Sequence, residues 1–249
     1  MSNEQMPQAH RLAELDTKHK STNPIYDLSN ITETEELTQK LRKMTESQQA
    51  ITFIDLSGST AAAFCIPQIV TAVSKIKTIT SINLSSCGIK KEEALTLMTE
   101  LRNSHSNHKV KQLDLSHNKI IGFHFLTTFL EKACGFLINI DLSHNGIMVE
   151  YEESSVAPLH GIMRFGSIKN LILDNNNISS FIAEKIKTGF QADSRKTYGI
   201  LSIKHQGQEL DLKFDDINFK HDTYLDREIG DEAIPVITGN ITSGMEDLD

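Results

Sequence analysis

Short runs in which aliphatic residues alternate with polar ones recur six times along the chain. Aligned on a core of the form L-x-L-x-x-N, their first aliphatic positions are Ile54, Ile82, Leu113, Ile140, Leu171 and Leu201. These positions are 28, 31, 27, 31 and 30 residues apart. Alternation with a period of two is typical of a short strand with one buried face. The sequence therefore predicts six equivalent strands, and a degenerate seventh copy precedes them around Leu28.

A second pattern fills the stretches between these strands, with apolar residues three and four positions apart, as in amphipathic helices. Its members are Leu37, Leu41 and Met44; Ile66, Ile69, Val70 and Val73; Leu95, Met98 and Leu101; Phe125, Leu126, Phe129 and Leu130; and Ile182, Ile186 and Phe190. Strand and helix therefore alternate within each period. This alternation predicts an α/β fold in which the strands stack as one parallel sheet and the bulkier helices lie on its other side.

One position just after each strand is also shared. It holds Ser59, Cys87, Asn118, Asn145, Asn176 and Gln206. These small or amide side chains can form hydrogen bonds with backbone groups where the chain turns away from the strand. The pattern favours a turn role for Cys87 over a catalytic one, since no base lies at a suitable spacing from it.

With these strands, helices and turn residues the chain resembles the leucine-rich repeat family, specifically the long, helix-containing class typified by ribonuclease inhibitor. The resemblance covers residues 26–206 and rests on six in-phase copies. It implies a solenoid, or horseshoe, of six to seven repeats with a concave parallel sheet and convex helices. A doubly wound sheet also alternates strands and helices, but it does not require the same turn residue in every unit.

The two ends depart from the repeat. We expect a flexible segment over residues 1–25, then the solenoid over 26–206, with an amphipathic helix at 30–47 as its amino-terminal cap. Two alternating runs joined at Gln206, Gly207 and Gln208 predict a hairpin that covers the last repeat. Residues 207–249 are thus assigned to a capping strand followed by a weakly ordered acidic tail.

Charge sharpens this division. The formal net charge is −8, but residues 208–249 hold three Lys or Arg against twelve Asp or Glu, so the rest of the chain is nearly neutral. A general affinity for nucleic acid is therefore not expected. The three cysteines fit no disulfide framework or zinc spacing, and neither a signal peptide nor a run long enough to span a membrane is evident. These features predict a soluble protein of a reducing, cytoplasmic compartment.

The outward strand positions provide the candidate binding face. Between the two inward residues of each strand the chain places Asp27, Asp55, Asn83, Asp114, Asp141, Ile172 and Ser202, and two positions later it has mostly serine, with Asp174 in the fifth copy. We expect Asp55, Asn83, Asp114, Asp141 and Asp174, together with His117 and His144, to form a negative groove for a basic protein segment. The alternative is that the repeated D-L-S tripeptide is family consensus, with serines that hydrogen-bond the aspartates.

His117 and His144 occupy the same position in adjacent copies. Two imidazoles one strand spacing apart could share a metal ion with Asp114 and Asp141, but duplication of the repeat explains the S-H-N run equally well. We therefore expect no metal and no cofactor. The sequence also holds no G-x-S-x-G, phosphate-binding loop, H-E-x-x-H or paired cysteines, so we expect a protein that is not an enzyme.

The preferred hypothesis is a monomeric module that binds a protein through the concave face, because repeat solenoids present large surfaces at little ordering cost. The chain also resembles leucine-rich-repeat effectors that intracellular bacteria deliver into host cytosol by type IV secretion, with a host protein as partner. The alternative function is GTPase activation, as in the Ran-activating leucine-rich-repeat class. It would need a positioned Arg or Asn, and Arg102, Arg164 and Arg195 share no repeat position.

Overall fold

The computed structural model describes residues 25–47, 49–122, 125–148, 167–179, 181–183, 199–205 and 208–214. In the last two ranges it describes the backbone alone. The chain divides into one unit, Met1–Asp215, and a second, Asp216–Asp249. The second unit and the first 24 residues lie outside the described residues, and with them the predicted flexible segment and acidic tail.

The protein is an α/β protein built on one eight-stranded sheet. Its strands lie side by side in chain order: β1 (Ile25–Asp27), β2 (Phe53–Asp55), β3 (Ser81–Asn83), β4 (Gln112–Asp114), β6 (Asn139–Asp141), β8 (Asn170–Ile172), β9 (Gly199–His205) and β10 (Gln208–Phe214). The first seven run parallel. Tyr26 pairs with Ile54, Ile54 with Ile82, and so on to Leu201, so the alignment deduced from the sequence is confirmed residue for residue.

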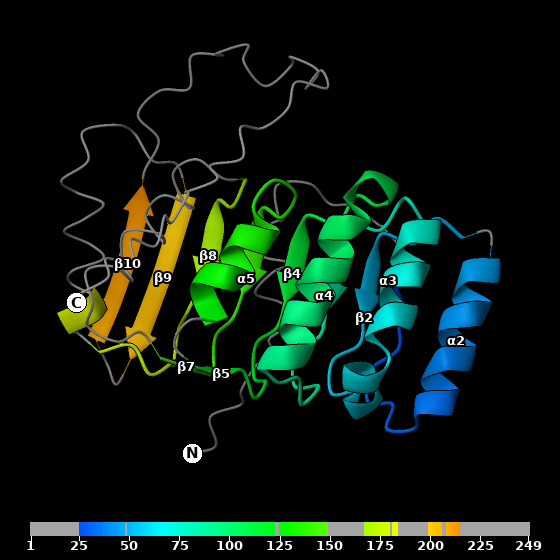
Figure 1. Cartoon of the computed structure of the whole chain (residues 1–249), viewed down its shortest axis with the longest axis horizontal. Coiled ribbons are helices and arrows are strands. Elements are labelled where there is room, and N and C mark those ends of the chain that lie inside the picture. Colours follow the sequence, from blue (N-terminus) through cyan, green and yellow to red (C-terminus); the bar gives the residue numbers. More distant parts are fainter. Residues whose placement is uncertain are drawn as a thin grey trace, which may run out of the picture. The chain divides into compact units, whose positions relative to one another are not determined.

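Among the described residues, four helices connect successive strands and lie next to one another on one face of the sheet (Figure 1). They are α2 (Thr34–Glu46), α3 (Ile66–Lys75), α4 (Lys91–Asn103) and α5 (Phe125–Ala133). Two short 3₁₀ helices, η1 (Thr60–Phe64) and η2 (His105–Asn107), complete the connections. The predicted cap helix is α2, with Glu35 and Glu36 in its first turn and Lys43 in its last, as the helix dipole favours.

The core lies between the sheet and the helices. Both inward residues are buried in the units of β2, β3, β4, β6 and β8, for example Ile54 and Leu56, whereas Tyr26 of β1 is half-buried. The predicted apolar faces of α2, α3 and α5 pack against them. The face predicted for α4 is partly wrong. Leu95 is only half-buried, and Ala94 and Leu97 are buried with Met98 and Leu101, because the three-and-four spacing admits two overlapping stripes in this leucine-rich helix.

A second sheet forms where the chain leaves the strands. Strand β5 (Ile121–Gly122) pairs in parallel with β7 (Gly146–Ile147), and the bridges Lys90 to Lys119 and Met148 to Asn177 continue the pairing on either side. At Gly146 a Cβ atom would lie 2.8 Å from Cγ1 of Ile121, so the close approach of the two segments requires glycine.

The end of the first unit agrees with the predicted hairpin. Strand β10 pairs antiparallel with β9, with Gln208 opposite His205 and Phe214 opposite Gly199. The last parallel strand is thereby covered by a strand that belongs to no sequence repeat. Within the described ranges no helix is long and apolar enough to cross a membrane.

Candidate binding face

The face of the sheet opposite the helices is held in place by polar side chains at the carboxyl ends of the strands. We call Ser59, Cys87, Asn118, Asn145 and Asn176 the turn ladder, because each one lies at the predicted turn position and bonds across to the preceding unit. Asn118 Nδ2 donates to the carbonyls of Leu84, Leu115 and Ser116, and its Oδ1 accepts the N–H of Ile89. The turn role predicted from the sequence is confirmed for these five residues.

The ladder is not uniform. Asn145 and Asn176 repeat the contacts of Asn118 one and two units further on. The hydroxyl of Ser59 makes a shorter version, donating to the carbonyl of Leu28 and accepting the N–H of Ile31. Cys87 Sγ donates to the carbonyl of Leu56 at 3.1 Å. Burial raises the pKa of the Cys87 thiol to about 12, so the reactive thiolate is suppressed and the residue is structural.

The predicted acidic positions form a regular column along the sheet. Asp27, Asp55, Asn83, Asp114 and Asp141, here the strand column, each accept the backbone N–H of the serine two residues later, at 2.8 to 3.0 Å. The alternative weighed from the sequence, serines bonded to the aspartates, is therefore confirmed for these five units. Asn83 shows that an amide oxygen fills the same role as a carboxylate.

The expectation that the strand column is an exposed groove is wrong over its centre. Asp27 is exposed and Asp55 half-buried, whereas Asn83, Asp114 and Asp141 keep only 3 to 5% of their surface exposed. Asp174 is buried as well. Side chains on neighbouring parallel strands stand about 4.8 Å apart, so a central residue is flanked on both sides while Asp27, on the edge strand, is flanked on one.

Burial has an electrostatic consequence at Asp114. Desolvation, and next the nearby charge of Asp141, raise the pKa of the Asp114 carboxyl to about 7. The hydrogen bonds from Ser116 act in the opposite direction but do not cancel these effects. At neutral pH this position of the column therefore carries only part of a negative charge. On the edge strand β1, the hydrogen bonds from Ser29 lower the pKa of Asp27 below its ordinary value. The Asp27 carboxylate is therefore fully ionised at neutral pH.

The two predicted histidines are brought together. The rings of His117 and His144 stack with centroids 4.0 Å apart and an interplanar angle of 11°. Nδ2 of Asn175 lies 3.0 Å from Nε2 of His144, within hydrogen-bond distance. Nε2 of His117 is buried without a hydrogen-bond partner among the described residues. Desolvation, with a smaller effect of His144, lowers the pKa of His117.

Stacked rings at this distance turn their faces, not their nitrogens, to one another. Within the described ranges no group of three or more His, Cys, Asp or Glu side chains is arranged to hold a metal ion. The arginines considered for GTPase activation give no support to that activity. Arg102 donates Nη1 to the carbonyl of Glu131 at 2.7 Å, and Arg164 and Arg195 lie outside the described residues.

The backbone conformation that positions His117 and His144 was not predicted from the sequence. Asn30, Gly58, Ser86, His117, His144 and Asn175 are equivalent, and all have φ between +54° and +71°. Only glycine adopts this left-handed conformation freely, and asparagine tolerates it, whereas a histidine is held there by its surroundings. The presence of Gly58, Asn30 and Asn175 in one aligned column was the signal that could have revealed it.

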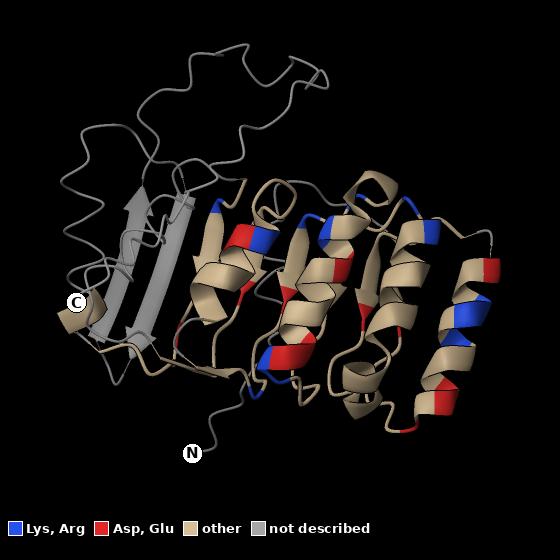
Figure 2. Ribbon diagram, in the orientation of Figure 1, with Lys and Arg blue, Asp and Glu red and all other residues tan. Residues whose placement is uncertain are grey.

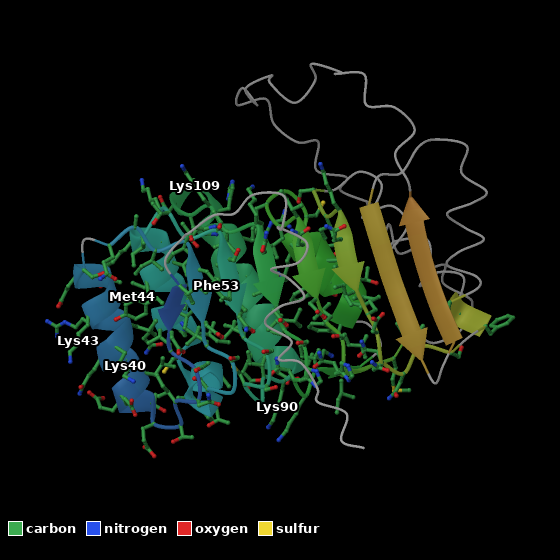
Figure 3. The ribbon with its side chains drawn as sticks, turned by 180° about the vertical axis from the view of Figure 1, so that it is seen from behind. Lys40, Lys43, Met44, Phe53, Lys90 and Lys109 are labelled. Carbon is green, nitrogen blue, oxygen red and sulfur yellow. The ribbon has the colours of Figure 1, made fainter. Side chains whose placement is uncertain are left out.

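A second missed feature is the column of residues that opens each strand. Ser81 donates its hydroxyl to Oε1 of Gln112 at 3.1 Å, and Nδ2 of Asn170 donates to Oδ1 of Asn139 at 2.6 Å. These side chains are half-buried on the helix-free face, as is Phe53 at the front, which Figure 3 labels. The accessible part of this face therefore consists mainly of amide and hydroxyl groups.

No protein-family model and no curated protein matches this chain. Among solved structures it is similar to one described as leiomodin-1 actin-binding site 2. That similarity has a TM-score of 0.45 and 11% sequence identity and covers 61% of this chain and 85% of the other. At these values it carries no conclusion about family or function.

Proposed function

We propose that the chain is a leucine-rich repeat solenoid of the ribonuclease-inhibitor-like class, a horseshoe of six to seven repeats, and that it acts as a non-enzymatic protein-interaction module. The observation that carries the proposal is the one-sided sheet. The described helices cover one face, and the other presents aligned columns of polar side chains along successive strands. Such a face binds an extended surface at little cost in ordering.

The partner proposed for this face is a protein with a basic segment. Asp27 and Asp55 are the accessible carboxylates of the strand column, and they offer the first contacts. Deeper in the column, a lysine or arginine side chain that reaches Asp114 would favour its ionised form, because a nearby cation lowers a carboxyl pKa. Binding should therefore release protons near pH 7 and tighten as the pH rises.

The test replaces Asp55, Asp114 and Asp141 together with asparagine and measures capture of partners from host-type cytosol. Asn83 already accepts its serine N–H in the same geometry, so the variant keeps the turns intact. We expect weaker capture and a loss of its sensitivity to salt. A matched control replaces three exposed glutamates at the amino ends of α2 and α4, Glu33, Glu35 and Glu92, with glutamine. Unchanged capture by the aspartate variant rejects the proposal for this face.

The biological setting proposed is that of a monomeric bacterial effector delivered into host cytosol by type IV secretion. It is supported by the resemblance stated above and by the concentration of acidic residues in the tail. Removal of the residues after Asp222 should abolish delivery in a translocation reporter assay while circular dichroism and the melting temperature stay unchanged. A cooperative loss of folding would instead make the tail part of the folded unit.

A further inference from the structure

The edge at which the parallel strands begin differs in charge from the edge that carries the turn ladder. Helices α3, α4 and α5 end there, and the loops from them lead back to β3, β4 and β6. Seven cations lie at this edge, and we call them the basic edge: Lys75, Lys77, Arg102, Lys109, Lys111, Lys132 and Lys169. Among the described residues of these helix ends and loops, only Glu100 and Glu131 are acids. In Figure 2 blue segments follow this edge, and others lie on α2 and at the opposite edge.

Helix stability accounts for part of the basic edge. Lys75, Arg102 and Lys132 lie in the last turns of α3, α4 and α5, where a positive charge favours the carboxyl end of the helix dipole. The other four lysines lie in loops beyond the helices, so this effect does not explain them.

The backbone aligns these loops. The N–H of Lys111 donates to the carbonyl of Thr80, that of Ile138 to Lys111 and that of Lys169 to Ile138, each at 2.8 Å. Lys111 and Lys169 therefore occupy one row, two strand spacings apart, or about 10 Å. Lys77 lies in the loop before β3, Lys109 and Lys111 in the loop before β4, and Lys169 just before β8, so the four lysines belong to loops that follow one another along the edge, with the loop before β6 between the last two.

These cations have no carboxylate partners in the described part of the chain. The ion pairs found there, Lys40 with Glu36 and Arg42 with Glu46, are both on α2. Arg102 and Lys111 donate instead to the backbone carbonyls of Glu131 and Phe136. Lys77, Lys109 and Lys169 are exposed. A nearly neutral body thus holds a row of unneutralised positive charge.

We propose that the basic edge binds an extended acidic segment of a partner protein. A line of single cations matches a chain that presents side chains in a row, as an extended peptide does. A membrane surface fits less well, because among the described residues a single large exposed apolar side chain, Ile25 at the start of β1, lies at this edge. Nucleic acid is disfavoured by the net charge of −8 on the whole chain.

The experiment titrates the full chain into a fluorescein-labelled peptide of twelve alternating Glu and Ser residues, in low salt, and follows anisotropy. A scrambled-charge peptide with equal Glu and Lys serves as the ligand control. The test variant carries Lys77→Glu, Lys109→Glu and Lys169→Glu. The matched control carries Lys90→Glu, Lys91→Glu and Lys119→Glu, which changes the net charge equally at exposed or half-exposed sites away from the basic edge. Figure 3 shows Lys90 and Lys109 at opposite edges.

We expect the test variant to bind the acidic peptide about tenfold or more weakly than wild type, and the control variant to change by about twofold or less. Raising the salt should weaken the wild type steeply and the test variant little. Equal losses in both variants would reduce the effect to net charge and overturn the proposal. So would no binding at millimolar protein, or tighter binding to single-stranded DNA or phosphatidylserine vesicles at equal charge.

The result of this binding experiment can be distinguished from the result of the aspartate test on the sheet face. The three lysines lie at the amino edge and the three aspartates of the earlier test in the strand column, so each variant leaves the other surface intact. Melting temperatures of both lysine variants should match the wild type within about 2 °C, since none of the lysines replaced forms an ion pair in the described residues.

Discussion

Polar residues have opposite roles at the two ends of the parallel strands. The strands end at what we call the carboxyl edge and begin at the amino edge, which is the basic edge. At the carboxyl edge, the side chains of the turn ladder and strand column are mostly buried and hydrogen-bonded within the chain. At the amino edge, Lys77, Lys109 and Lys169 are exposed and have no carboxylate partner among the described residues. The first edge therefore contributes to stability, because a buried polar group without its partner is costly. The second edge contributes positive charge that no carboxylate in the described part of the chain neutralises.

The largest change in the free energy of unfolding is expected when Asn118 of the turn ladder is replaced. Replacing it with alanine leaves the N–H of Ile89 and the carbonyls of Leu84 and Leu115 without their side-chain partner. We expect a loss of about 3 kcal/mol in the free energy of unfolding, measured in urea. Cys87→Ala, which removes a single thiol contact, should cost about 1 kcal/mol.

The matching change at the amino edge is Lys109→Ala. Lys109 is exposed, so its truncation should alter the free energy of unfolding by no more than about 0.5 kcal/mol. If Lys109→Ala were as costly as Asn118→Ala, the distinction between a structural and a binding edge would be wrong.

Replacing Asp114 should change the free energy of unfolding less than replacing Asn118, and should stabilise the fold instead of destabilising it. Its pKa is raised from 3.8 to about 7 in the folded chain, so between these pH values the folded state binds more protons than the unfolded state. Stability therefore falls as the pH rises from 4 to 7, and the ionised carboxyl destabilises the fold above that range. Asp114→Asn should stabilise the protein by about 2 kcal/mol at pH 8 and by much less at pH 4, as followed by urea unfolding.

The control for Asp114→Asn is Asp55→Asn, which makes the same exchange in a half-buried member of the strand column. Both variants keep the bond from the serine N–H, as Asn83 does. A stability gain that is equal for Asp55→Asn and Asp114→Asn, or that persists at pH 4, would contradict the assignment to the buried charge.

The sequence was sufficient for the sheet and the ladder because both depend on short periods. Strand pairing follows from the alternation around Ile54 and Ile82, and the turn bonds follow from one aligned polar position. The sequence did not predict that Asp114 and Asp141 are buried. A column of alternating polar residues looks the same whether neighbouring strands enclose it or leave it open, since exposure depends on spacing between units, which periodicity does not contain.

The basic edge was missed for a related reason. Lys77, Lys109, Lys111 and Lys169 occupy no single aligned position in the sequence, because the loops before the strands differ in length. The net charge of the body also concealed them, since acids elsewhere, including Asp27, Asp55, Asp114 and Asp141 of the strand column, balance them in the count. Backbone hydrogen bonds hold Lys111 and Lys169 in one row, and the order of the strands places the loops of Lys77 and Lys109 at the same edge.

The smallest change in the free energy of unfolding is expected when His117 is replaced. His117 lies at the carboxyl edge but lacks the side-chain hydrogen bonds that its neighbours have. Its φ of 55° is the conformation that asparagine tolerates best after glycine, and Asn30 and Asn175 occupy the equivalent positions. His117→Asn should therefore raise the free energy of unfolding by about 0.5 kcal/mol at pH 7.5.

The gain at His117 should grow as the pH falls. The pKa of His117 is lowered from 6.5 in the folded chain, so below pH 6.5 the unfolded state binds more protons, and the histidine destabilises the fold there. The difference in melting temperature between His117→Asn and wild type should thus be larger at pH 5.5 than at pH 7.5. His105→Asn, at an exposed site, provides the control and should show no such growth. If the difference shrank at pH 5.5, His117 would be stabilised by protonation, and its buried, unpartnered Nε2 would have to acquire an acceptor on charging.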